Sequence, residues 1–148
     1  MSKDEFRTVV KALITHKGDI LIGQKEDDED HEIGGKWHVL GGHLEKGEQV
    51  EEAMEREVKE ETGLEVNVHQ IVDTSTFSCG DGEKDSLQIF FHCEADSRKA
   101  EAEDDLQDLK WVEPDELVEE VHEDETERLK KRDSIQNFIE KLKKMPVV

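Results

Sequence analysis

The sequence predicts an α/β fold in which one mixed β-sheet lies between helices, and three observations lead to that prediction. Short runs rich in β-branched residues, such as residues 6–15, alternate with turn signals. One helix is expected to open at Glu48, where an acidic side chain suits the positive end of the helix dipole, with Gly63 in the usual place of a helix C-cap. Apolar residues recur at helical spacing near the C-terminus, which predicts an amphipathic helix that packs on the sheet.

The order of elements follows from local patterns along the chain. Residues 6–15 and a strand beginning at Ile20 are expected to form a hairpin. Further strands are expected at residues 37–40, 64–72, 87–93 and 109–112, and loops or turns at 26–35, 74–84 and 94–108. Pro114 is expected to begin a helix. The last helix is expected to bury Ile135, Phe138, Ile139 and Leu142, with Leu129 extending the same stripe. Without a repeat or linker, residues 1–148 are expected to form one domain.

The first predicted helix carries acidic side chains where an ordinary surface helix would not. With an advance of about 100° per residue, Glu57 and Glu61 fall on the stripe that contains Val50 and Met54, and Glu60 lies on its flank. Carboxylates held together at the inner edge of a helix repel one another, and each is unfavourable to desolvate unpaired. A hard divalent cation such as Mg²⁺ prefers such oxygen ligands. The alternative is a charge-rich surface helix with a drifting apolar period.

The spacing of residues around this helix favours the metal site. From Gly42 to Leu64 the chain reads Gly-x5-Glu-x7-Arg-Glu-Val-x-Glu-Glu-x-Gly-Leu. The chain therefore resembles the Nudix hydrolases, whose Nudix box has this pattern. The resemblance implies an α/β/α sandwich and hydrolysis of a nucleoside diphosphate linked to another moiety X. One departure lies just before the paired glycines, where related sequences usually carry proline and this chain has Leu40.

The resemblance also implies a role for each charged residue of the box. Glu48 would support the site, and Arg56 would orient the glutamates through a salt bridge, since Arg56 and Glu60 can meet across one helical turn. The metal, Mg²⁺ or in its place Mn²⁺, would be held by the carbonyl oxygen of Gly41 and by Glu57, Glu60 and Glu61. Such a metal would neutralise phosphate oxygens, position a water and lower its pKa.

The general base is sought outside the box. By resemblance to MutT-like members, it is an acid that precedes a tryptophan-containing strand. Glu103, Asp104 and Asp105 precede Trp111, and Asp105 has the best spacing of the three.

Contacts with the substrate are expected at the end of the second strand and around the paired glycines. The candidates are Lys25, Trp37 and Gly42. Lys25 stands where the resemblance implies a basic residue that contacts phosphate, and a solvated lysine is the alternative. Base stacking is open to Trp37, Phe77, Phe90 and Trp111, and burial in the core is the alternative for each. The histidines show no metal-ligand spacing.

The charge of the chain bounds its partners. With 40 acidic and 20 basic residues among 148, the formal net charge is −20. A nucleic-acid polymer or an anionic membrane is therefore not expected as a partner, whereas a small nucleotide can be bound through a metal. Adaptation to high salt is an alternative cause of the acidity. A homodimer is one candidate assembly.

The sequence shows neither a signal-peptide pattern nor the roughly 20 consecutive apolar residues of a membrane span. A cytoplasmic location is therefore expected. Cys79 and Cys93 are too few for a disulfide framework and are expected as free thiols.

Three functions remain open from the sequence. The first is a MutT-like nucleoside triphosphate pyrophosphohydrolase that releases a monophosphate and pyrophosphate, favoured by the short chain without tyrosine and with only two prolines. The second is hydrolysis of ADP-ribose or a sugar nucleotide. The third is a non-catalytic nucleotide-binding sensor on the same fold, which the intact box argues against.

Overall fold

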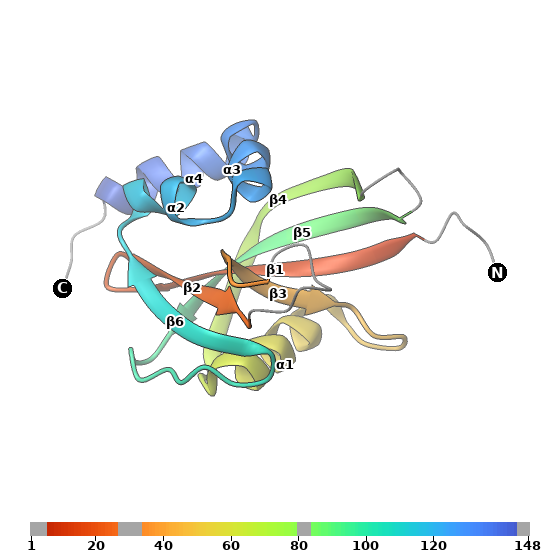
Figure 1. Cartoon of the computed structure of the whole chain (residues 1–148), viewed down its shortest axis with the longest axis horizontal. Helices are drawn as coiled ribbons and strands as arrows, with labels where there is room; N and C mark the ends of the chain where they lie inside the picture. Colours follow the sequence, from red (N-terminus) through yellow and green to blue (C-terminus); the bar gives the residue numbers. More distant parts are fainter. Residues whose placement is uncertain (1–5, 27–33, 80–83, 145–148) are drawn as a thin grey trace.

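Six strands form one mixed sheet with helices on both faces, which confirms the predicted fold class (Figure 1). The computed structural model describes residues 6–26, 34–79 and 84–144. Its strands are β1 (Arg7–His16), β2 (Asp19–Lys25), β3 (Trp37–His43), β4 (Val66–Cys79), β5 (Lys84–Ala95) and β6 (Leu106–Val112). Its helices are α1 (Val50–Thr62), the 3-10 helix η1 (Pro114–Glu116), α2 (Leu117–Glu120), α3 (Glu123–Lys130) and α4 (Asp133–Lys144).

Strand β1 lies at the centre of the sheet and changes partner along its length. The strand order is β4-β5-β1-β3-β2-β6, and only the β1–β5 pair is parallel among the described strands. Residues 9–12 of β1 pair with β3, whereas residues 14–16 pair with β2 through the expected hairpin. This arrangement brings β3, and the start of the segment that leads into α1, against the first half of β1.

The alternation of side chains along β1 divides the core into two layers. Val10, Ala12 and Ile14 pack under α1, together with Met54 and Val58 of that helix. On the opposite face, Leu13 packs with residues of β2 and of helices α2, α3 and α4, including Ile20, Ile22, Leu117, Leu129, Ile135 and Ile139. Figure 1 shows α1 on one side of the sheet and α2–α4 on the other.

The prediction of a turn at residues 74–84 is wrong for the part that the structure describes. Residues 74–79 continue β4, and Lys84 already belongs to β5, because the two strands pair along almost their whole length. The pairing register shifts between Val68 and Gln70 and again between Ile71 and Asp73. Such bulges change the face to which side chains point, so the strand does not keep the simple alternation that marks shorter strands. Residues 80–83 lie outside the described part of the chain.

Other boundaries also differ from the sequence prediction. Gly41 and Gly42, expected in a loop, belong to β3 and pair with β1. Strand β6 begins at Leu106, within the segment predicted as a loop up to residue 108, and β5 runs on to Ala95. Leu129 lies in α3 rather than on an extension of α4, because the chain leaves the helix after Lys130. Leu129 and Ile135 nevertheless reach the same core layer.

In α4, Ile135, Ile139 and Leu142 are buried as predicted, whereas Phe138 is only partly buried. Pro114 begins η1, as predicted, in a capping box between Glu113 and Glu116.

Within the ranges that the structure describes, no helix is both long and apolar enough to cross a membrane. Cys93 is a buried free thiol, and the side chain of Cys79 lies outside the described part.

Candidate functional site

Helix α1 carries the acidic residues of the box and is closed by local signals at both ends. Gln49 and Glu52 form a capping box at its start, so Glu48, which was expected to open the helix, lies just before it. Gly63 ends the helix in the left-handed conformation with φ 76°, as predicted. The face formed by Ala53, Met54 and Val58 is buried against the sheet.

The expectation that two glutamates lie at the inner edge of this helix is confirmed. The residue Glu61 is only 5% exposed, and the side chain of Glu57 is 13% exposed. Glu60 lies on the flank, with its side chain 49% exposed. Two carboxylates therefore lie where the helix meets the sheet.

The glycines of β3 make room for these carboxylates. The backbone N–H of Gly41 donates a hydrogen bond to Glu61 Oε1 over 3.2 Å. A Cβ atom at Gly42 would lie 2.4 Å from the carboxylate carbon of Glu57, so only a residue without a side chain leaves Glu57 in its place. Gly42 is thus needed for the close approach between β3 and Glu57 of α1, whereas a Cβ at Gly41 would meet the backbone of β1.

Burial and mutual repulsion shift the acidity of both inner glutamates. Burial raises the pKa of Glu61 to about 8, and the charge of Glu57 adds to this effect while Lys11 opposes it. Burial also raises the pKa of Glu57, although Arg56 works in the opposite direction. The charge of Asp104 contributes to both increases. A cation bound between these groups would remove the penalty.

Arg56 forms ion pairs with the carboxylates of Glu48, Glu57 and Glu60. Its Nε donates to Glu48 Oε2 over 2.6 Å, and one terminal nitrogen contacts Glu57 Oε1 at 3.0 Å and Glu60 Oε2 at 3.2 Å. The hydrogen bond from Arg56 lowers the pKa of Glu48 below its usual value. The predicted contact between Arg56 and Glu60 is therefore present, and Arg56 also holds Glu48 and Glu57.

A pocket of about 550 Å³ gathers most of the predicted site residues. From the box and its flanks, its lining includes Gly41, Gly42, Arg56, Glu57, Glu60 and Glu61. From other parts of the chain, it includes Lys25, Asp104 and Asp105. Glu48, Trp37 and Glu103 do not line it. The fold thus brings together residues from three strands, one helix and the loop that precedes β6.

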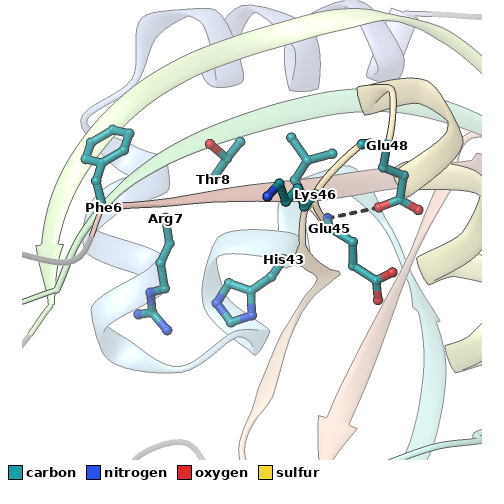
Figure 2. A pocket seen from close by; sticks show the side chains of 9 residues that line it. Phe6, Arg7, Thr8, His43, Glu45, Lys46 and Glu48 are labelled. Atoms are coloured by element: carbon teal, nitrogen blue, oxygen red, sulfur yellow. Dashed lines mark hydrogen bonds between the residues drawn. The ribbon is translucent and has the colours of Figure 1, made fainter. Parts of the chain in front are cut away.

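Glu48 instead lines a neighbouring pocket of about 620 Å³ that shares His43 and Glu45 with the first (Figure 2). Figure 2 shows Arg7 and Thr8 pointing to opposite sides of β1, with Arg7 on the same side as His43. The backbone N–H of Glu45 donates to Glu48 Oε1 over 3.0 Å. Glu48 therefore ties the loop before α1 to Arg56.

The three candidate bases lie in different surroundings. Asp105 forms an ion pair with Lys25 at the pocket wall. Asp104, whose backbone has φ 59°, is the acid whose charge acts on Glu57 and Glu61. The backbone N–H of Glu103 donates to the carbonyl oxygen of Glu61 over 3.0 Å, at the C-terminal end of α1. Asp104 and Asp105 line the pocket, whereas Glu103 does not.

Of the aromatic candidates for base stacking, Trp37, Phe90 and Trp111 do not line this pocket. Trp37 packs against the core layer beneath α2–α4, and the Nζ atom of Lys110 lies 4.3 Å from the centre of its ring. Phe90 is a buried core residue, and Trp111 is covered by Arg98 4.9 Å from its ring centre. The side chain of Phe77 lies outside the described part. For Trp37, Phe90 and Trp111, the packing agrees with the alternative of a role in or beside the core.

Lys11 and His38 are among the pocket residues that sequence reasoning missed. Lys11 on β1 lies 3.5 Å from Glu125 Oε2 of α3 and donates to the carbonyl oxygen of Val39 over 3.3 Å. His38 on β3 is only 6% exposed and also lines the pocket. A lone lysine and a lone histidine in apolar strands were the only sequence signals, and neither indicates where its partner lies.

The donor set fits a divalent cation, although it is not gathered around one point. Within residues 6–26, 34–79 and 84–144, no three acidic, histidine or cysteine side chains stand in a ready cation-binding arrangement. One carboxylate oxygen of Glu57 and one of Glu60 accept hydrogen bonds from Arg56. One oxygen of Glu61 accepts a hydrogen bond from the backbone N–H of Gly41. Each carboxylate has a second oxygen. Buried, mutually repelling carboxylates with further oxygens are the chemistry that Mg²⁺ or Mn²⁺ requires.

Comparisons with known proteins agree with this geometry. The family model described as the NUDIX domain matches residues 5–138. The nucleoside triphosphatase NudI of Escherichia coli K12 is 33% identical over 121 residues, covering 76% of this chain and 85% of that protein. The MutT protein from Methanosarcina mazei Go1 superposes with a TM-score of 0.69 at 22% identity, covering 97% of this chain and 96% of that one. The E. coli ORF135 protein gives a TM-score of 0.64 at 26% identity over 78% of this chain and 79% of its own.

Proposed function

Because the chain belongs to the Nudix hydrolase family, we propose that it hydrolyses nucleoside triphosphates to a nucleoside monophosphate and pyrophosphate with the help of a divalent metal. That it is a hydrolase of phosphoric anhydride bonds follows from the family. The substrate and products are the proposal. The substrate class is supported by NudI, a relative named as a nucleoside triphosphatase.

One observation carries the proposal: Glu57 and Glu61 share a pocket with two lysines. Both carboxylates line the same cavity of about 550 Å³, which also includes Lys11 and Lys25. Carboxylates that hold a cation beside lysine ammonium groups suit a triphosphate, because both the cation and the lysines offset its negative charge.

The residues of the box have two roles in this proposal, metal binding and positioning of the metal ligands. Glu57, Glu60 and Glu61 would hold the metal, which when bound would neutralise phosphate oxygens and make a water more acidic. The carbonyl oxygen of Gly41 is a further candidate ligand. Arg56 holds Glu57 and Glu60 in place through bonds of 3.0 and 3.2 Å, and Glu48 anchors Arg56 from the other side.

The reaction breaks the anhydride bond between the α- and β-phosphorus atoms. A water adds to one phosphorus atom, the bridging oxygen leaves with the other, and a base takes the proton of the water. Asp104 and Asp105 are the candidate bases because both line the pocket. Lys25, which pairs with Asp105, is a candidate for binding the phosphates that depart as pyrophosphate.

The test is a turnover assay with chromatographic separation of products. Canonical and oxidised nucleoside triphosphates, ADP-ribose and sugar nucleotides are each incubated with the protein and Mg²⁺ or Mn²⁺. Glu61→Gln is the test variant and Glu55→Gln the matched control, since Glu55 lies on the exposed face of the same helix. We expect monophosphate and pyrophosphate from a triphosphate, a loss of about 100-fold or more in Glu61→Gln, and wild-type rates in the control.

Each other outcome contradicts a defined part of the proposal. Turnover of ADP-ribose or a sugar nucleotide in preference to triphosphates would refute the substrate assignment. Undiminished activity in Glu61→Gln would refute the metal assignment. Nucleotide-dependent stabilisation without turnover of any compound would support a binding sensor instead. Asp104→Asn and Asp105→Asn, assayed side by side, identify the base by the larger loss of kcat.

A further inference from the structure

His38 is a buried polar side chain that lines the pocket. It lies on β3, three residues before the paired glycines, and is 6% exposed. Its Nδ1 is 2.9 Å from the carbonyl oxygen of Val39. Its Nε2 is buried and has no hydrogen-bond partner among the residues that the structure describes. Buried polar atoms in folded proteins are nearly always paired, and none of the described residues supplies a partner, so this nitrogen is a candidate contact for a bound molecule.

The chemistry of Nε2 follows from the bond at Nδ1. A carbonyl oxygen only accepts, so Nδ1 must carry the proton and donate it to Val39. Burial and the nearby charge of Lys11 lower the pKa of His38 to about 4, so the ring is neutral at physiological pH. In a neutral imidazole protonated at Nδ1, Nε2 presents a lone pair. His38, which lines the pocket, therefore carries a buried, uncharged hydrogen-bond acceptor.

This acceptor is suited to only one part of a nucleotide. Phosphate oxygens are acceptors themselves and offer no proton to Nε2 at neutral pH. Lys11 and Lys25 of the same pocket are donors and suit the phosphates. The nucleoside half, in contrast, bears N–H groups on its base and O–H groups on its ribose.

We propose that His38 determines specificity by accepting, at Nε2, a hydrogen bond from an N–H or O–H donor of the nucleoside part of the substrate. The proposal rests on the proposed function in that the substrate is a nucleotide. It adds the prediction that the pocket selects for a donor at this point. A site built to accept such a bond discriminates against analogues without the donor, because its buried acceptor is then left unpaired.

The test combines variants of His38 with substrates that differ in one donor. His38→Leu removes the acceptor, and His38→Gln restores a side-chain carbonyl oxygen. His69→Leu, at an exposed position of β4, is the control for loss of a histidine. Inorganic tripolyphosphate contains the anhydride bonds without a nucleoside. Inosine and guanosine triphosphates differ in one amino group, purine riboside and adenosine triphosphates in another, and 2′- and 3′-deoxy nucleotides lack single hydroxyls.

We expect His38→Leu to raise KM for the preferred nucleotide about tenfold, the effect of one neutral hydrogen bond, with little change in kcat. His38→Gln should recover part of the loss. Hydrolysis of tripolyphosphate, and of the one analogue that lacks the contacted donor, should be insensitive to the substitution. The identity of that analogue distinguishes a base donor from a ribose hydroxyl. In the wild type, the ¹⁵N resonance of His38 Nε2 should shift on addition of a non-hydrolysable nucleotide.

Two results would overturn the proposal. An equal loss of kcat for every substrate, tripolyphosphate included, would mean that His38 acts on the attacking water or on the fold. Unchanged KM values together with an unchanged ¹⁵N resonance would mean that only water occupies the position. If the wild type hydrolyses none of the nucleotides, the proposed function fails, and calorimetric binding of the non-hydrolysable nucleotide to wild type and His38→Leu still decides the role of His38.

Discussion

Replacing Gly42 by alanine would displace the carboxylate of Glu57 while leaving the fold intact. The added Cβ would lie 2.4 Å from the carboxylate carbon and 2.5 Å from both carboxylate oxygens, whereas ordinary contacts begin near 3.4 Å. The carboxylate must therefore move by about 1 Å. It can do so because it is the end of a flexible side chain.

The expected effects on activity and stability differ in size. A displacement of about 1 Å in a reacting group can reduce a rate by about 100-fold, so kcat/KM should fall by that order. The free energy of unfolding should change by less than about 1 kcal/mol, because an alanine in an accessible backbone conformation also restricts the unfolded chain. Activity and stability should therefore separate in Gly42→Ala.

Gly41→Ala provides the contrast. A Cβ there would lie 2.1 Å from the backbone carbonyl oxygen of Val10 and 2.9 Å from the Cα of Lys11, and neither can move without disturbing the β1–β3 pairing. We expect the free energy of unfolding to fall by about 3 kcal/mol. Urea unfolding and steady-state kinetics on both variants measure the two quantities. Wild-type kcat/KM in a folded Gly42→Ala protein would refute the displacement of the Glu57 carboxylate. If the displacement occurs, adding Glu57→Asp, which shortens the side chain, should restore part of the lost activity.

Two further predictions concern the charges around the pocket. In metal-free protein, burial raises the pKa of Glu61 to about 8 from an ordinary 4.5, so the folded state binds the proton more tightly than the unfolded state. Thermal stability should therefore fall as the pH rises from about 4.5 to 8. Glu61→Gln or added Mg²⁺ should flatten that part of the profile, and an unaltered slope in both would contradict the assignment. Glu125→Gln should reduce the free energy of unfolding by about 2 kcal/mol, because its buried carboxylate accepts from the backbone N–H of Val39 over 2.5 Å and lies 3.5 Å from Lys11 Nζ. Urea titration measures this loss, and Glu127→Gln, exposed on the same helix, is the control.

The local features of the site were predictable because they depend on neighbours in sequence. Helical spacing alone indicated that Glu57 and Glu61 face inward, and the glycine after the helix marked its end. The contact between Arg56 and Glu60 spans one turn. Such relations are determined by the rise and twist of a helix, which every sequence shares.

The longer strands were not predictable in the same way. The chain between Thr74 and Cys79 is polar, yet it forms part of β4 because β5 lies beside it and supplies hydrogen-bond partners. Two bulges interrupt the alternation that would have identified the strand. Strand length thus depends on the partner strand as well as on the composition of the segment.

By itself, the sequence determined the family, the helix that carries the carboxylates and the segment that supplies a candidate base. Only the tertiary structure decided that Lys11 lies next to Glu125, 114 residues away, and that the two inner glutamates share a pocket with Lys25. It also decided that a buried nitrogen of His38 has no hydrogen-bond partner among the described residues. The physical reason is that burial and pairing depend on which surfaces meet after folding, and a lone lysine or histidine in a strand looks the same in sequence whether it meets solvent, a carboxylate or a ligand.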